Sequence, residues 1–162
     1  MGKKASKAVG NIYYNARCSA AEEIEEKFSS RESASEIVHI ERTRLANIEL
    51  GNITPYPEEV KMMAEVYNMP ELCNSYCARE CPIGKGSIQE VQMDDFDRLS
   101  LRVLGSLQDI DTLKDSLIEI SEDGVISIDE QEKFNNIIDA LEKISNNAKA
   151  LRLWAKKNIR FE

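Results

Sequence analysis

Hydrophobic residues in the second half of the chain recur at alternating intervals of three and four positions. One such repeat runs from Phe96 to Ile120 and another from Phe134 to Ala155. This spacing gathers apolar side chains on one side of an α-helix, so each repeat predicts one long helix. Together the two repeats predict a helical hairpin with a heptad seam.

The apolar stripe of this hairpin is wider than a two-stranded coil requires. Extra hydrophobic residues lie beside the heptad positions at Leu101, Leu104, Leu107, Ile118 and Ile138. A wide stripe suits a bundle with several neighbours, because a lone hairpin cannot bury it fully. We therefore expect a partner, most simply a second copy of the chain, in a homodimer through residues 94–160.

The first half predicts five shorter helices. Helical periodicity begins near Tyr13 and runs to Phe28, where two serines interrupt it. Ser29 and Glu32 have the spacing of a capping box, which predicts that the second helix starts at about Arg31.

Turn residues delimit the other three helices. His39-Ile40 precede a third helix over residues 41–49, which Gly51 ends as a left-handed cap. Pro57 suits the first turn of a fourth helix over 58–67, and Pro70 opens a fifth over 71–77. No segment alternates usefully at period two, so the fold class is predicted to be all-α, without a sheet.

A linker rich in helix breakers divides the chain. It contains Pro82 and the stretch from Gly84 to Ser87. We place the boundary after Lys85, which gives a five-helix domain over residues 1–85 and a helical hairpin over 86–162. The hairpin is the candidate oligomerisation domain.

Charge is distributed unevenly over the 162 residues. The net charge of −8 argues against indiscriminate binding of nucleic acid. Residues 1–66 hold 9 basic and 11 acidic residues, whereas residues 67–162 hold 12 and 18, so the first half is the better candidate for contact with phosphates. No apolar run approaches the ~20 residues that span a bilayer, and the basic start lacks the apolar region of a signal peptide. A cytoplasmic protein is expected.

The segment from Ser30 to Gly51 carries a recognisable pattern. Ser30 stands at a helix cap, the small Ser35 lies at the centre of a short helix, and His39 precedes the aliphatic Ile40. The segment then ends in Ile-Glu-Leu-Gly over residues 48–51, with Pro55 beyond. This pattern resembles the helix-turn-helix of the Cro/C1 repressor-like (XRE) family.

The resemblance implies a lambda-repressor-like five-helix domain that binds double-stranded DNA, with residues 41–49 as the recognition helix. It extends over residues 12–85, where Cys-Pro-Ile-Gly at 81–84 resembles a subfamily from Firmicutes and their phages. The chain departs from the family at two positions. His39 stands where the family usually has Gly, and Arg31 where it often has Gln.

Candidate DNA-binding residues follow from the exposed part of the recognition helix. Arginine binds guanine bidentately and asparagine binds adenine, while the start of the second helix suits a phosphate. The candidates are Arg31, Arg42, Thr43, Arg44 and Asn47. Lys3, Lys4 and Lys7 are expected to form an arm along the DNA backbone. Glu41 stabilises the helix dipole but repels phosphate.

These features predict a sequence-specific transcriptional regulator of bacterial or phage origin. The alternative is a protein-interaction module of a phage or mobile element that keeps the helix-turn-helix fold without binding DNA. The acidic balance favours the alternative, and Arg42, Arg44 and Asn47 favour the regulator.

Two other motifs have both a metal-binding and a structural interpretation. Cys73, Cys77 and Cys81, with Cys18, suggest a thiolate zinc site or a redox role, but zinc sites usually use close cysteine pairs. Packing of the fifth helix explains the same residues. Asp123-Gly124 and Glu130 resemble half of a calcium-binding loop, although a helix end and a capping box explain them equally. No metal or cofactor is expected. The single histidine, His39, lies in the turn of the motif, so no enzyme is expected.

Overall fold

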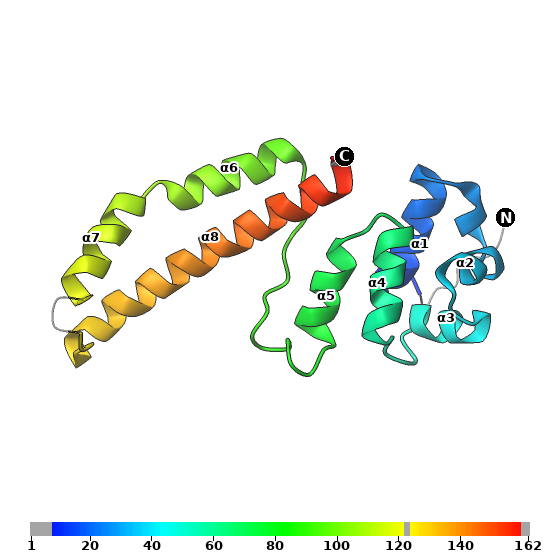
Figure 1. Cartoon of the computed structure of the whole chain (residues 1–162), viewed down its shortest axis with the longest axis horizontal. Helices are drawn as coiled ribbons and strands as arrows, with labels where there is room; N and C mark the ends of the chain where they lie inside the picture. The colour runs from blue at the N-terminus through cyan, green and yellow to red at the C-terminus, as the bar shows by residue number, and fades with distance from the viewer. Residues whose placement is uncertain (1–7, 122–123, 160–162) are drawn as a thin grey trace. The chain divides into compact units, whose positions relative to one another are not determined.

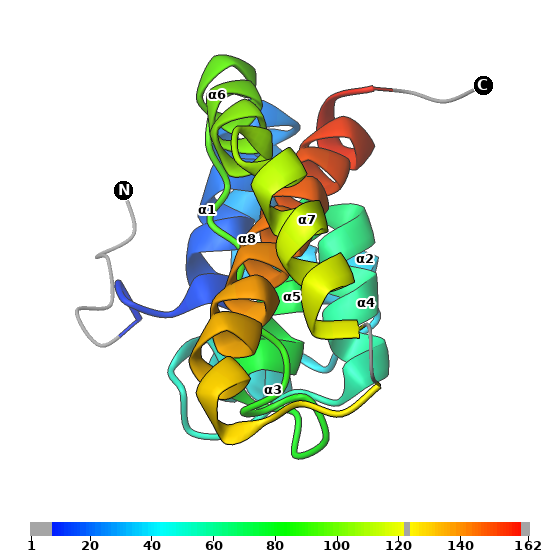
Figure 2. The same cartoon turned by 90° about the vertical axis from the view of Figure 1, so that its left-hand side faces the viewer.

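The computed structural model describes residues 8–121 and 124–159, and every regular element within these ranges is helical. The predicted all-α fold class is thereby confirmed. The chain forms two compact units, residues 1–90 and 91–162, which are described separately (Figures 1 and 2). Among the described helices, none combines the length and apolar character needed to cross a bilayer.

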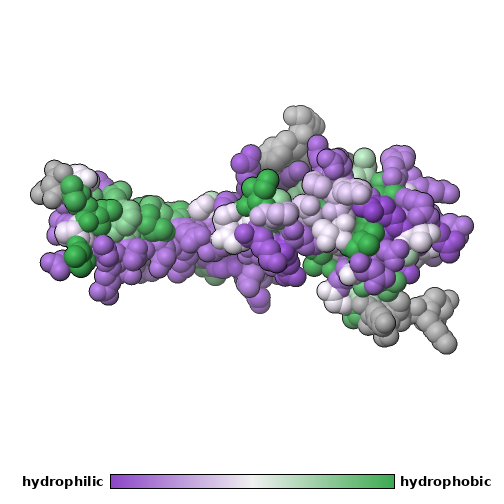
Figure 3. Space-filling model, turned by 90° about the horizontal axis from the view of Figure 1, so that it is seen from below, coloured by the Kyte–Doolittle hydropathy of each residue, from purple (hydrophilic) through white to green (hydrophobic). Residues whose placement is uncertain are grey.

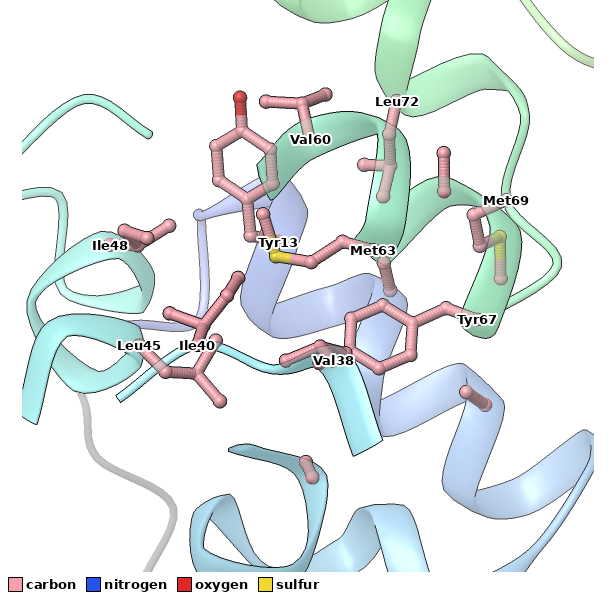
Figure 4. Close-up of a cluster of buried hydrophobic side chains, with 14 of the residues drawn as sticks. Tyr13, Val38, Ile40, Leu45, Ile48, Val60, Met63, Tyr67, Met69 and Leu72 are labelled. Carbon is pink, nitrogen blue, oxygen red and sulfur yellow. The ribbon is translucent and has the colours of Figure 1, made fainter. Parts of the chain in front are cut away.

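The first unit contains five α-helices and one 3-10 helix. They are α1 (Ile12–Glu23), η1 (Glu26–Ser29), α2 (Arg31–Val38), α3 (Arg42–Glu49), α4 (Pro57–Val66) and α5 (Glu71–Arg79). Their buried side chains meet in one core, to which all five α-helices contribute; Figure 4 shows Tyr13 of α1, Val38 of α2, Leu45 of α3, Met63 of α4 and Leu72 of α5 among its members.

The first helix is shorter than the sequence pattern predicted. It ends at Glu23 instead of Phe28, and a 3-10 turn follows. Glutamates at 22, 23, 25 and 26 would repel one another at helical spacings of three and four, which explains the early end. Phe28 still reaches the core, where its ring packs edge-on against Tyr67 at 5.5 Å between centroids.

The cap of α2 is Ser30, as the family pattern has it, and the capping box predicted from Ser29 is wrong. The Ser30 hydroxyl accepts a hydrogen bond from the Ser33 amide at 3.1 Å. Ser29 belongs to η1, where its carbonyl accepts a hydrogen bond from Arg17 at 3.0 Å. The ends of α3, α4 and α5 otherwise lie within two residues of the predicted positions.

The segment after α5 folds back onto the first unit. Gly84 lies so close to α5 that an added Cβ would stand 2.2 Å from the Cys77 carbonyl oxygen. Asn74 donates a hydrogen bond to the Gln89 carbonyl at 3.2 Å, and Arg79 pairs with Glu90 at 2.5 Å. The predicted linker is therefore held by α5, and the border between the units follows Glu90.

The second unit is a helical hairpin. One arm consists of α6 (Phe96–Leu107) and α7 (Ile110–Ser121), and the other is η2 (Ile128–Glu130) followed by α8 (Gln131–Asn158). The first arm was predicted as one continuous helix, but it is broken after Leu107. Gly105 and Ser106 lower the helix propensity just before the break. Both α6 and α7 contact α8 (Figure 1).

A capping box opens the second arm of the hairpin. The Glu130 carboxylate accepts hydrogen bonds from the Ser127 amide at 2.9 Å and the Ser127 hydroxyl at 2.7 Å. Gly124 has a φ of +72°, as the helix-end interpretation of this loop requires. Asp123, the other residue of the calcium-loop pattern, lies outside the described residues.

Candidate nucleic-acid interface

A sharp turn joins α2 to α3. His39 adopts the left-handed conformation with φ 54° and ψ 36°, and the Ile40 amide donates to the Ser35 carbonyl at 3.1 Å. Histidine tolerates this conformation better than most residues with a side chain, so the departure from glycine at this position leaves the turn intact. The turn brings α3 into contact with α2.

Buried side chains from both helices fix this arrangement. Ala34 and Val38 of α2, Ile40 of the turn, and Leu45 and Ile48 of α3 are each at most 4% exposed. Burial of each valine, leucine or isoleucine side chain contributes about 1.5–3 kcal/mol to the stability of the fold.

A buried ion pair ties α3 to α1. Glu49 is fully buried and Arg17 is 4% exposed, and their side chains form two hydrogen bonds of 2.6 and 3.1 Å. Arg17 also donates to the carbonyl of Phe28 at 2.7 Å. These bonds compensate the desolvation of both charges and fix the buried side of α3.

Arg31, a predicted phosphate contact, joins the same carboxylate. Its Nε donates to Glu49 Oε2 at 2.6 Å, and its side chain is 27% exposed. The Nε side of the Arg31 guanidinium is thus bonded within the protein. Arg31 lies at the start of α2, as the predicted phosphate contact requires. In the structure it is the second cation, after Arg17, that pairs with Glu49.

Arg44, a predicted base contact, is held between α3 and α4. Its Nε and Nη2 donate to the Glu59 carboxylate at 2.5 and 2.9 Å, and its guanidinium lies 4.2 Å from the centre of the Tyr56 ring. Burial raises the pKa of Glu59, but the bonds from Arg44 and the Tyr56 amide outweigh it and lower that pKa overall. The hydrogen bond to Glu59 raises the pKa of Arg44. Arg44 therefore has an internal partner already.

Glu41 caps the N-terminus of α3. Its carboxylate accepts hydrogen bonds from the Thr43 and Arg44 amides, both at 2.9 Å, and these bonds lower the pKa of Glu41. The carboxylate occupies the amides that a helix N-terminus otherwise offers to an anion. The start of α3 is thus closed to a phosphate while Glu41 is in place.

Three of the five predicted residues lie together on the outward side of α3. Arg42 and Thr43 are exposed, and Asn47 lies one turn farther along. The Asn47 side-chain oxygen Oδ1 accepts a hydrogen bond from Asn52 Nδ2 at 3.0 Å. Arg42 is 65% exposed, and its Nη1 lies 3.9 Å from Glu32 Oε2. This distance is too long for a hydrogen bond.

The charge of this surface is weakly acidic. With Arg31 and Arg44 paired, the exposed charged side chains of α2 and α3 are Arg42 against the carboxylates of Glu32, Glu36 and Glu41. Lys3, Lys4 and Lys7, the predicted arm, lie outside the described residues.

Sequence reasoning missed the two carboxylates that hold the arginines. Glu49 lies four residues after Leu45 and next to Ile48, so it falls on the buried side of α3, and a buried carboxylate needs a cation. That signal was available. Glu59 gave no comparable signal, because acidic residues are common in the first turn of any helix.

The cysteines pack around the core. Cys73, Cys77 and Cys81 contact it as half-buried side chains, and all four cysteines are free thiols. Within the part of the chain that the structure describes, no three His, Cys, Asp or Glu side chains are grouped to hold a metal ion.

Comparison of the chain with family models, with curated proteins and with solved structures finds no match.

Proposed function

We propose that the chain is a sequence-specific DNA-binding regulator and that the outward side of α3 contacts base edges in a major groove. The observation that carries the proposal is the pair of short helices α2 and α3, joined by the left-handed turn at His39. In this motif the first residues of the second helix reach the bases. Arg42 and Thr43 occupy those positions.

The proposal assigns different roles to the five predicted residues. Arg42 and Asn47 read bases, since arginine matches guanine and asparagine matches adenine. Thr43 contacts a base or the backbone. Arg31 and Arg44 position the helix from their ion pairs and reach phosphates from the sides of the motif.

The proposal includes a homodimer through residues 94–160. One helix-turn-helix contacts few base pairs, and the weakly acidic surface makes single-domain binding weak. Two linked domains raise the apparent affinity without new contacts. A two-fold dimer requires half-sites about 10 base pairs apart, centre to centre, or a multiple of that spacing.

Selection from random-sequence double-stranded DNA tests this function. The full chain is used at about 50 and about 200 mM salt, because phosphate contacts weaken steeply between these concentrations. We expect enrichment of an inverted repeat at the lower concentration. Absence of any enriched sequence at low salt would overturn the proposal.

A second candidate function is favoured by the acidic surface. Glu32, Glu36 and Glu41 outnumber Arg42 among the exposed charges of α2 and α3. A module that uses this surface to bind a basic protein needs the fold but no DNA contact. The same selection separates the two candidates, since such a module enriches no sequence at any salt concentration.

A further inference from the structure

The hairpin of the second unit buries few of its hydrophobic residues. Its core cluster consists of Val91, Leu99 and Ala150 with three half-buried neighbours that include Trp154. Nine large apolar side chains of α6, α7 and α8 remain 37–68% exposed. They are Phe96, Leu101, Leu104, Leu107, Ile110, Leu117, Ile118, Ile138 and Leu141.

These side chains form a surface that a monomer would leave in water. Figure 3 shows hydrophobic residues gathered along one side of the hairpin and hydrophilic residues along the other. Contiguous apolar surface of this kind marks an interaction site. The hydrophobic surface alone does not identify the partner, but the charges on α8 do.

The charges of η2 and α8, the second arm of the hairpin, are separated along its length. Residues 129–142 carry five acidic side chains and one lysine, Lys133, which gives a net charge of −4. Residues 143–158 carry five basic side chains and no acidic one, which gives +5. The change of sign falls between Glu142 and Lys143, close to the middle of the helix.

The basic side chains lie on the exposed side of α8. Ile138 and Leu141 are followed at helical intervals by Lys149, Arg152 and Lys156, so all five share one side. Each of the five is exposed. Among the described residues, no salt bridge joins these three cations to a carboxylate.

The helix dipole does not explain this pattern. Acidic residues at the start and basic residues at the end of a helix are favourable, but the effect falls off within one turn. It accounts for Glu132 and for Lys156 and Lys157. It leaves Asp139, Glu142, Lys143, Lys149 and Arg152 without a reason to be sorted by sign.

We infer that the hairpin pairs face to face with a second copy of itself, with the two α8 helices antiparallel. In this arrangement the acidic half of each α8 faces the basic half of the other, at both ends of the contact. A parallel arrangement would place +5 against +5 and −4 against −4. The inference rests on the dimer of the proposed function but not on DNA binding.

The antiparallel arrangement fixes where the N-terminal units attach. Val91 packs with Ala150, toward the end of α8, so each chain enters the bundle at its own basic end. With the pairing centred between Glu142 and Lys143, the two copies of Ala150 lie about 22 Å apart along α8, from 1.5 Å per residue.

Sedimentation equilibrium of the full chain tests the inference through charge reversal. One variant carries Lys149→Glu, Arg152→Glu and Lys156→Glu, a second carries Glu132→Lys, Asp139→Lys and Glu142→Lys, and a third carries all six. We expect each triple variant to raise the dimer dissociation constant about tenfold or more at low salt. The sixfold variant should recover part of the lost affinity, because the two halves again carry opposite net charges, −1 over residues 143–158 and +2 over residues 129–142.

Opposite results identify other arrangements. In a parallel dimer each triple variant relieves repulsion and tightens the dimer, which would overturn the inference. A wild-type chain that is monomeric at micromolar concentration would also overturn it, even if that chain still selects a DNA sequence.

Salt provides a test that needs no substitution. The wild-type antiparallel dimer should weaken as salt rises, and a dimer that tightens would contradict it. Helical content measured by circular dichroism identifies any variant that fails to fold. For such a variant the salt dependence of the wild-type dimer decides the question.

Discussion

Removal of Arg17 should destabilise the first unit strongly, because it leaves a buried carboxylate without its main cation. Arg17→Ala leaves the fully buried Glu49 with Arg31 as its only cation and deletes two bonds to backbone carbonyls. Breaking a buried ion pair from one side costs about 3–5 kcal/mol. Arg31→Ala is the matched control, since it removes one partly exposed bond and leaves the Arg17 pair, at about 1 kcal/mol.

Urea unfolding can be followed separately in the two units. All five tyrosines lie between residues 13 and 76, whereas the only tryptophan, Trp154, lies in the hairpin. The tyrosine signal should shift strongly in Arg17→Ala and slightly in Arg31→Ala, while the Trp154 signal stays unchanged. The combined variant Arg17→Met/Glu49→Leu should be more stable than Arg17→Ala, because no buried charge remains unpaired. A loss below about 1 kcal/mol in Arg17→Ala, or equal losses in both arginine variants, would refute the assigned role of the pair.

Three further predictions concern the first unit and its comparison with the hairpin. Glu41→Ala should be less stable than the wild type at neutral pH, because the helix amides bind the ionised carboxylate. The difference should begin to shrink at the ordinary glutamate pKa of about 4.3 and be lost only below the lowered pKa of Glu41 in the folded protein. Glu41→Ser should keep the cap without this pH dependence, and a difference from Glu41→Ala that does not shrink on acidification would contradict the assignment. Gly84→Ala should destabilise the first unit, since the added Cβ meets the Cys77 carbonyl oxygen. Gly105→Ala, where the added Cβ on α6 meets no other atom, should instead stabilise the hairpin by about 0.5–1 kcal/mol. Thermal unfolding that shows equal effects of the two substitutions would count against the close packing of Gly84. Tyr67→Phe should be neutral or stabilising in urea unfolding, because the buried Tyr67 hydroxyl has no hydrogen-bond partner among the described residues, and a loss above about 1 kcal/mol would show that the hydroxyl is satisfied.

Local patterns predicted most of the helices. Caps and breakers such as Gly51, Pro57 and Pro70 act within one turn, so their effect can be read from neighbouring residues. The end of α1 was missed because repulsion among the glutamates at 22–26 outweighed the apolar spacing that reaches Phe28. The break after Leu107 was missed because the apolar heptad spacing continues through it, so the hydrophobic pattern alone predicts one helix.

The candidate site was less predictable than the fold. The sequence placed Arg42, Thr43 and Asn47 on the outward side of α3, where the structure also has them. It did not anticipate that Arg31 and Arg44 bind Glu49 and Glu59, because these pairs join residues 18 and 15 positions apart. Such pairs depend on the packing of separate helices, which no local pattern encodes.

The central claim is that the outward side of α3 binds DNA, and Arg42→Ala tests it most directly. Binding of a selected double-stranded DNA is measured by fluorescence anisotropy for the wild type, Arg42→Ala and Arg98→Ala. Arg98 is an exposed arginine of the hairpin, so its removal changes the net charge equally. We predict that Arg42→Ala weakens binding by about 1–3 kcal/mol and that Arg98→Ala leaves it nearly unchanged. Equal weakening in both variants, or none in either, would contradict the claim.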